Sequence, residues 1–164
     1  MVALRLVRLI ENHSEQLAEG LARKIHTSAR TTDMRRIPLE ELQERICEIF
    51  RNLSQWLLTK TETEVEHRYL DIGMRRAGQG ISLPDLTWAI VMTKEYLWGF
   101  LQRQGFLHSA VELYGEMELL WLLNQFFDQA ICSMIEGYEQ ASLPAADRVV
   151  GTGRQARQSA SGAH

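Results

Sequence analysis

Apolar residues recur every three or four positions through most of this chain of 164 residues. That period is typical of amphipathic α-helices, whereas a half-buried strand would alternate apolar and polar residues. No stretch combines such alternation with an enrichment in β-branched residues. The pattern therefore predicts an all-α fold of about five to six helices without a sheet.

The first two predicted helices each carry one apolar side. The first should end in the polar stretch 29–33, and a loop with Arg35 and Arg36 should follow. The second begins at Pro38, because proline suits the first turn of a helix. The apolar sides are formed by Leu6, Ile10, Leu17, Leu21 and Ile25 in the first helix, and by Leu39, Leu42, Ile46, Ile49, Leu53 and Leu57 in the second.

Three later helix starts are marked by a Ser or Thr followed three residues on by an acidic residue, a spacing that allows reciprocal capping. A glycine able to take positive φ, and so to end the preceding helix, comes just before two of them. The pairs are Thr61 with Glu64, Ser82 with Asp85 and Ser109 with Glu112, and the glycines are Gly80 and Gly105.

The two C-terminal helices are predicted over 83–104 and 111–140, and the second should be the longest element. The helix over 83–104 is apolar on nearly every side, so it must be central or give a face to a partner. After residue 141 the chain becomes rich in Ala, Gly, Ser and Arg. We therefore predict a helical domain over 1–141 and a disordered tail over 142–164.

Composition and charge favour a cytoplasmic protein. The formal net charge is −3, so charge alone does not attract nucleic acid. Cys47 and Cys132 lie far apart and have no basic activating neighbour in sequence, so we expect two reduced, core-type thiols. Redox sensing by these cysteines is the alternative. Arginines interrupt the N-terminal apolar residues, so no signal peptide is expected, and no apolar run is long enough to cross a membrane.

Catalytic motifs are absent from the sequence: it has no HExxH, phosphate loop, GxSxG or GxGxxG after a strand. Glu64 and Glu66 lie close to His67 in the sequence, but no second His or Cys stands at ligand spacing from it. A surface histidine is therefore favoured over a metal ligand, and no metal site is predicted. The chain is not expected to be an enzyme.

Arg76 is the unusual residue of the third helix. Val65, Tyr69, Ile72 and Arg76 follow one another at spacings of four, three and four, which places the guanidinium on the apolar side. The favoured interpretation is that the arginine stem covers apolar surface and the head reaches water or an acid. The alternative is an anion or ligand contact inside a pocket, for which Tyr69, Arg76 and Trp88 are the candidates.

A stripe of small residues, Gly73, Ala77 and Gly80, runs beside Arg76. A glycine inside a helix costs about 1 kcal/mol relative to alanine, so close approach of a neighbouring helix is the simplest explanation. We expect the aromatic side chains of the last two helices to lie in the core or at a subunit interface, and not to line a ligand cavity. Trp98, Trp121 and Phe127 are the interface candidates.

The long segment YLDIGMRRAGQGISLPDLTWAI over 69–90 resembles the N-terminal domain of RsbR-type proteins, the RsbT co-antagonist RsbRD N-terminal family. The likeness continues through TKEYLWGFL at 93–101, ELYGEMEL at 112–119, FFDQA at 126–130 and GYE at 137–139, and covers most of residues 5–140. The resemblance implies a globin-like helical sensory domain, usually dimeric, that precedes an output domain such as a STAS domain or a kinase. Residues after Tyr138 are too few and too polar for such an output domain, so we expect either a sensory module that acts alone or one whose output partner is a separate chain.

The segment IGMRRAGQGI over 72–81 is also similar to the Ile-Gly-x-x-His-x-x-Ile-Gly-Leu stretch of haem-binding globin-coupled sensors. Arg76 stands at the position of the proximal histidine, and arginine stays protonated and does not ligate iron as imidazole does. The resemblance therefore implies a globin-like domain without haem or another cofactor.

The sequence accordingly favours a non-enzymatic sensory or regulatory module of bacterial stress or environmental signalling, which forms a homodimer and signals to a partner protein. A haem- or small-molecule-binding sensor using His67 or another histidine is the first alternative. The second is a hydrolase or transferase whose site is assembled from scattered Glu, His and Tyr residues.

Overall fold

The structure is a computed structural model that describes residues 2–104 and 110–144. These residues form helices and no strand, which confirms the predicted all-α fold. The elements are the α-helices α1 (Val2–Asn12), α2 (Ser14–Thr27), α3 (Leu39–Arg51), α4 (Glu62–Gly78), α5 (Leu83–Arg103) and α6 (Ala110–Ser142), with a 3-10 helix η1 (Thr32–Arg36) and a π-helical turn η2 (Gln55–Thr59).

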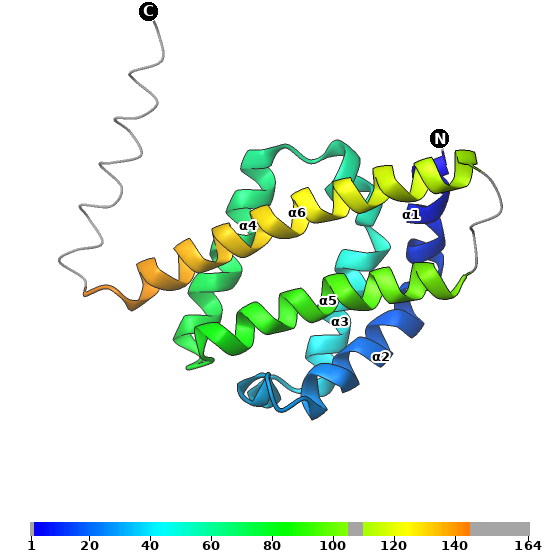
Figure 1. The fold of residues 1–164 in the computed structure, drawn as a ribbon. Coiled ribbons are helices and arrows are strands. Elements are labelled where there is room, and N and C mark those ends of the chain that lie inside the picture. The colour runs from blue at the N-terminus through cyan, green and yellow to red at the C-terminus, as the bar shows by residue number, and fades with distance from the viewer. Residues whose placement is uncertain (1, 105–109, 145–164) are drawn as a thin grey trace, which may run out of the picture.

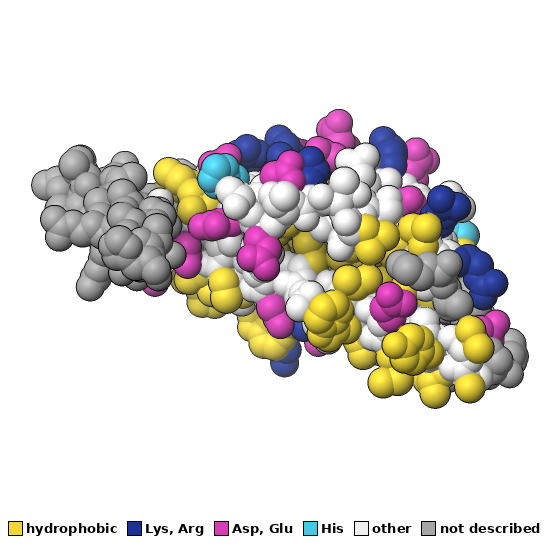
Figure 2. Space-filling view, turned by 90° about the horizontal axis from the view of Figure 1, so that it is seen from above, with side chains coloured by type: hydrophobic (Ala, Val, Ile, Leu, Met, Phe, Trp, Pro, Cys, Tyr) yellow, Lys and Arg dark blue, Asp and Glu magenta, His cyan; other side chains and the backbone are white. Residues whose placement is uncertain are grey.

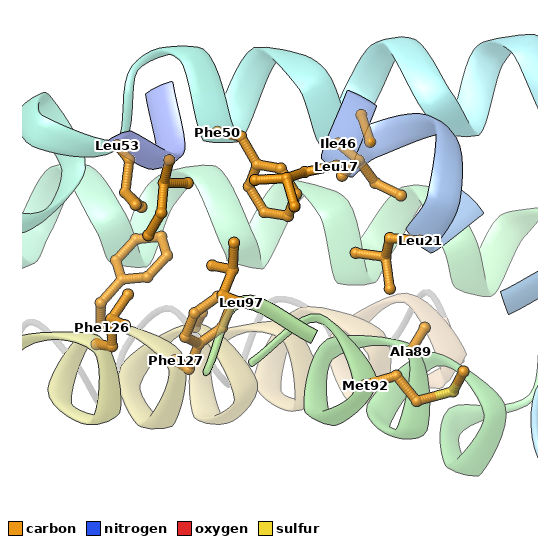
Figure 3. Packing of buried hydrophobic residues seen from close by; sticks show 14 of the residues in the cluster. Leu17, Leu21, Ile46, Phe50, Leu53, Ala89, Met92, Leu97, Phe126 and Phe127 are labelled. Atoms are coloured by element: carbon orange, nitrogen blue, oxygen red, sulfur yellow. The ribbon is translucent and has the colours of Figure 1, made fainter. Parts of the chain in front are cut away.

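The longest helix of the described chain, α6, spans 33 residues and contacts α1, α4 and α5 (Figure 1). It runs antiparallel to α5 (Figure 1), while α2 and α3 pack against each other on the other side of the core. The core lies between these layers, and Figure 3 shows Phe50 of α3 and Leu53, which follows α3, facing the layer that carries Leu97 and Phe126. The apolar side predicted for the second helix therefore packs inward.

The helix predicted over the first 28 residues is broken at His13, so that α1 and α2 are separate elements. His13 has ψ 17°, well away from a helical value, and its ring Nδ1 donates to the carbonyl of Leu9 at 2.8 Å. The same ring lies 5.5 Å from that of Phe100. The side chain thus supplies a hydrogen bond to a carbonyl group at the end of α1. The apolar stripe continues through both helices, so the sequence pattern did not indicate the break.

The predicted loop after the first helix forms the 3-10 helix η1, which is tied to the turn between α4 and α5. Arg36 donates from Nη1 to the carbonyl of Gly80 at 2.8 Å. Gly80 has φ +72°, so the prediction that this glycine permits the end of a helix is confirmed.

The start of α5 is capped from two directions. Ser82 accepts a hydrogen bond from the backbone of Asp85, as predicted, at 3.4 Å. The reciprocal bond differs from the prediction, because the backbone N–H of Ser82 donates to the carboxylate of Asp33 and the carboxylate of Asp85 accepts the N–H of Asp33 at 2.8 Å. A residue 49 positions earlier therefore completes the cap.

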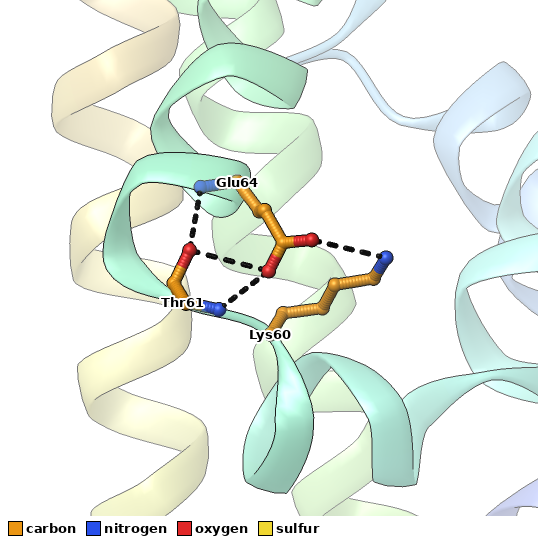
Figure 4. A network of polar contacts seen from close by, with 3 residues as sticks. All are labelled: Lys60, Thr61 and Glu64. Carbon is orange, nitrogen blue, oxygen red and sulfur yellow. Dashed lines mark hydrogen bonds and ion pairs between the residues drawn. The ribbon is translucent and has the colours of Figure 1, made fainter.

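The start of α4 has the complete reciprocal cap that the sequence predicted (Figure 4). Thr61 Oγ1 accepts from the backbone N–H of Glu64 at 3.3 Å, and the carboxylate of Glu64 accepts the backbone N–H of Thr61 at 2.8 Å. Lys60 Nζ lies 3.7 Å from the other carboxylate oxygen. The predicted pair of Ser109 with Glu112, and Gly105 before it, involve residues outside the described chain.

Replacing Thr61 with alanine should lower the free energy of unfolding by about 1 kcal/mol, because the hydroxyl that satisfies an N-terminal amide of α4 is lost. Chemical denaturation at neutral pH measures this change. Thr63→Ala is the matched control, since Thr63 is exposed inside the same helix. An equal effect of the two substitutions would contradict the capping role.

Glu64 makes this cap depend on pH. The backbone N–H of Thr61 holds the pKa of the Glu64 carboxyl below its usual 4.5. A carboxyl with a lowered pKa in the folded state stabilises the fold above the unfolded-state pKa, and the contribution is lost as the pH falls through the folded-state value. Any stability advantage of the wild type over Glu64→Gln should therefore be present at neutral pH and disappear well below pH 4.5.

One member of the predicted small-residue stripe, Gly73, allows α6 to approach α4 closely, whereas Gly80 lies in the turn after α4. A Cβ atom added at Gly73 would collide with the carbonyl oxygen of Met134 and lie 2.8 Å from the backbone nitrogen of Tyr138. On the other helix, a Cβ at Gly137 would collide with the carbonyl oxygen of Leu70. The two helices therefore touch backbone to backbone, which confirms the interpretation of Gly73 as a site of close helix approach.

Candidate functional site

A small cavity of about 110 Å³ lies between α2, η1, α3, α4 and α5. Two of the three predicted pocket residues, Tyr69 and Arg76, line it. Most of the remaining lining is aliphatic, and four arginines take part. The lining residues are Ile25, Met34, Leu42, Arg45, Ile46, Ile49, Arg68, Tyr69, Ile72, Arg75, Arg76, Leu86, Ala89, Ile90 and Thr93.

Arg76 is the buried charge of this cavity, with a side chain that is only 7% exposed. Its Nη1 donates to Gln79 Oε1 at 2.7 Å and lies 3.8 Å from a carboxylate oxygen of Glu41. Burial lowers the pKa of Arg76, and the negative charge of Glu41 opposes that change. The guanidinium is therefore neither free in water nor held in a close ion pair.

The other arginines of the cavity add positive charge around Arg76. Arg75 is exposed, whereas Arg45 and Arg68 are half-buried. The positive charges of Arg75 and Arg45 contribute to the lowered pKa of Arg76. Arg68 Nη2 lies 3.4 Å from Glu48, but its Nε atom is buried without a hydrogen-bond partner in the described chain.

Tyr69 joins the cavity to an aromatic cluster. Its ring meets the ring of Phe126 edge-on at 5.6 Å and that of Trp56 at 6.3 Å. Phe126 in turn packs on Phe127 at 5.1 Å. Complete burial raises the pKa of the Tyr69 phenol, so this group stays protonated.

Trp88, the third predicted pocket residue, is absent from the residues that line the cavity. It lies on α5 with its side chain 37% exposed, and the guanidinium of Arg30 stacks over its ring at 4.2 Å. The structure therefore brings Tyr69 and Arg76 together and places Trp88 in a cation–π pair at the surface.

The three interface candidates have different surroundings. Trp121 is 59% exposed on α6, whereas Trp98 is half-buried against the core. Phe127 is fully packed in the aromatic cluster and shows in Figure 3 among the buried side chains. Within one chain, only Trp121 of the three presents most of its side chain to the surface.

Trp121 belongs to a larger exposed apolar surface on the N-terminal half of α6, which we call the α6 face. Tyr114, Met117 and Trp121 are each more than half exposed, at 73%, 62% and 59%. Val111 and Leu113 extend the same surface. Figure 2 shows hydrophobic side chains gathered at the end of the molecule where α6 begins. Apolar side chains gathered at the surface in this way are typical of interaction sites.

The remaining sequence candidates fall outside both features. His67 is exposed, and the described residues contain no group of acidic, Cys and His side chains that could hold a metal ion. Cys132 is exposed, which corrects its interpretation as a core thiol. Cys47 is buried as predicted, but Arg51 one turn later donates to its sulfur at 3.3 Å, so the expectation of no basic neighbour was wrong. In the described chain, no helix combines the length and apolarity needed to cross a membrane.

Sequence reasoning singled out Arg76 but missed the arginines around it. Arg68, Arg75 and Arg76 are separated by seven and eight positions, which places them on one side of α4, so a helical projection could have grouped them. Arg45 comes from α3, and no local pattern indicates that it meets α4. The exposure of Tyr114 and Met117 was missed because their helical spacing resembles that of core residues.

The comparison with protein families gives a match over residues 5–150 to the RsbT co-antagonist protein rsbRD N-terminal domain. No curated protein and no solved structure matches the chain. The family match covers most of the sequence and agrees with the likeness seen along 69–90 and the later segments. The chain therefore belongs to the family of RsbT co-antagonist protein rsbRD N-terminal domains, which are regulatory signalling modules.

Proposed function

We propose that this protein is a cytoplasmic, non-enzymatic sensory module of bacterial stress signalling that forms a homodimer and passes its signal to a partner protein. Family membership supports the regulatory role. The observation that carries the dimer is the α6 face, because large apolar side chains exposed together are costly unless another surface covers them.

The composition of the α6 face suits a protein interface. Tyr, Trp and Met are enriched at such interfaces, and tryptophan and tyrosine often supply most of the binding energy. In a symmetric dimer the face would meet its own copy, so each side chain contributes twice. A helix shift at this interface would then carry the signal to the partner protein.

The cavity supports a module without haem. Its volume of about 110 Å³ is well below the 300–1,000 Å³ of pockets that hold drug-sized ligands. Arg76, at the position of the proximal histidine in haem-binding sensors, is buried in that cavity and cannot ligate iron. A globin-like arrangement of helices whose cofactor space is closed by side chains fits these observations. A strong haem absorption band in purified protein would favour the alternative, a haem sensor.

The dimer is tested with Trp121→Glu combined with Met117→Glu. Multi-angle light scattering at micromolar concentration should give a dimer for the wild type and a monomer for the variant. A charge in the middle of an apolar symmetric interface should weaken dimerisation by about 100-fold or more. Circular dichroism should show unchanged helix content, because both side chains are exposed in the single chain.

Trp88→Glu is the control, because it places a glutamate at an exposed tryptophan outside the α6 face. This variant should remain a dimer. A wild type that is monomeric at high concentration, or a Trp121 and Met117 variant that dimerises as tightly as the wild type, would contradict the proposed interface.

A further inference from the structure

We propose that the cavity at Arg76 binds a small monocarboxylate, whose carboxylate group pairs with the arginines while its short apolar tail lies among the aliphatic side chains. This inference deepens the proposed function, on which it rests, by naming the class of ligand that the sensory module detects.

The positive charges around the cavity favour the binding of an anion. Four arginines line it, and ion pairs within the described chain reach two of them, Arg76 with Glu41 and Arg68 with Glu48. Guanidinium groups close to one another and partly withdrawn from water raise each other's energy. An added carboxylate would neutralise this excess and could accept two hydrogen bonds from one guanidinium.

Two hydrogen-bonding groups are available for that carboxylate. Arg68 Nε is buried without a partner in the described chain, and a buried donor left unpaired costs about 1–3 kcal/mol. The contact of Arg76 with Glu41 spans 3.8 Å, which exceeds a hydrogen bond, and the side chain of Glu41 is 41% exposed. A ligand carboxylate could therefore bind Arg76 more closely than Glu41 does.

The rest of the lining selects an organic anion over an inorganic one. The aliphatic residues Ile25, Leu42, Ile46 and Leu86 are buried, whereas Arg75 is exposed. The cavity thus has an apolar lining beside the buried Arg76, and Arg75 lies toward solvent. A cavity of 150 Å³ holds benzene, so one of about 110 Å³ suits a ligand of about four to six heavy atoms.

Ligand binding in this cavity has a route to the α6 face. Five of the lining residues lie on α4, and α4 touches α6 backbone to backbone at Gly73 and Gly137. Helices packed this closely do not absorb a displacement by side-chain adjustment, so a shift of α4 would move α6 as well. The α6 face is carried by that same helix.

The test is a titration of the ¹⁵N-labelled full chain followed by NMR, at constant ionic strength, with sodium isobutyrate as the probe. Isobutyramide, which has the same shape without the charge, and sodium formate, which has the charge without the tail, are the matched ligands. Isobutyrate should shift amide signals of α3 and α4 around the cavity. Both matched ligands should bind at least tenfold more weakly.

Variants locate the site. Arg76→Met should weaken isobutyrate binding at least tenfold, while Arg8→Met, an exposed arginine on α1, should leave it unchanged. If Arg76→Met does not fold, Ala89→Leu serves instead, because it fills the cavity from α5 without removing a charge. It should abolish binding of isobutyrate.

Equal binding of isobutyrate and isobutyramide, unchanged binding by Arg76→Met, or no binding of isobutyrate at tens of millimolar would each overturn the proposal. Formate binding as tightly as isobutyrate would also overturn it, because the apolar tail would then contribute nothing to binding. A dimer that binds no carboxylate would leave the proposed function standing. A monomer that binds isobutyrate would overturn the proposed dimer and not the ligand site.

Discussion

Replacing Gly73 with alanine is expected to lower the free energy of unfolding by about 3 kcal/mol, at the upper end of the usual cost of overpacking. The added methyl group would overlap with the backbone of Met134 and approach that of Tyr138, so α4 and α6 would have to separate. A flexible side chain could move aside, but a helical backbone cannot do so without losing packing along its length. Chemical denaturation followed by circular dichroism measures the change.

Gly78 provides the matched control on the same helix, because nothing lies within 4 Å of a Cβ atom added there. Gly78→Ala should be neutral or raise stability by about 0.5 kcal/mol, since alanine restricts the unfolded chain more than glycine does. If both substitutions had the same small effect, the close contact of α4 with α6 would be contradicted.

Phe126→Ala should lower the free energy of unfolding by about 3–5 kcal/mol, the range for removing a buried aromatic side chain. Phe126 is 4% exposed and contacts the rings of Trp56, Tyr69 and Phe127. It therefore joins the η2 turn, α4 and α6 at one point. Thermal and chemical denaturation measure the loss.

Phe126→Leu is the conservative control and should cost about 1–1.5 kcal/mol, because most of the apolar volume remains. Fluorescence of Trp56 gives a second readout, since its ring lies 6.0 Å from that of Phe126. If Phe126→Ala unfolded at the same temperature and denaturant concentration as the wild type, the aromatic cluster would not stabilise the fold.

The aromatic cluster shows where prediction from sequence stops. The helical spacing of Phe126 and Phe127 placed both on an apolar side, and they were assigned to core or interface together with Trp121. The structure buries the two phenylalanines and exposes Trp121. Spacing along one helix identifies its apolar residues, but it does not show which of them another helix covers.

The break at His13 and the cap at Ser82 have a similar origin. A helix with a continuous apolar stripe looks unbroken in sequence. The hydrogen bond from His13 to Leu9 accompanies the break, but the spacing of the apolar residues does not change there. The carboxylate of Asp33, which caps Ser82, comes from a residue far away in the chain. Only the fold brings such groups within hydrogen-bonding distance.

The sequence alone was enough to predict the helical class, the start of α4 at Thr61, the need for a small residue at Gly73 and the family, because these depend on local spacing or on a long pattern along one chain. It also placed Tyr69 and Arg76 on the same side of one helix. The packing of the helices, by contrast, brings Arg45 of α3 to the same cavity and leaves the α6 face uncovered within one chain. Both outcomes depend on how separate helices pack against one another, and helical periodicity carries no information about the neighbour that each side will meet.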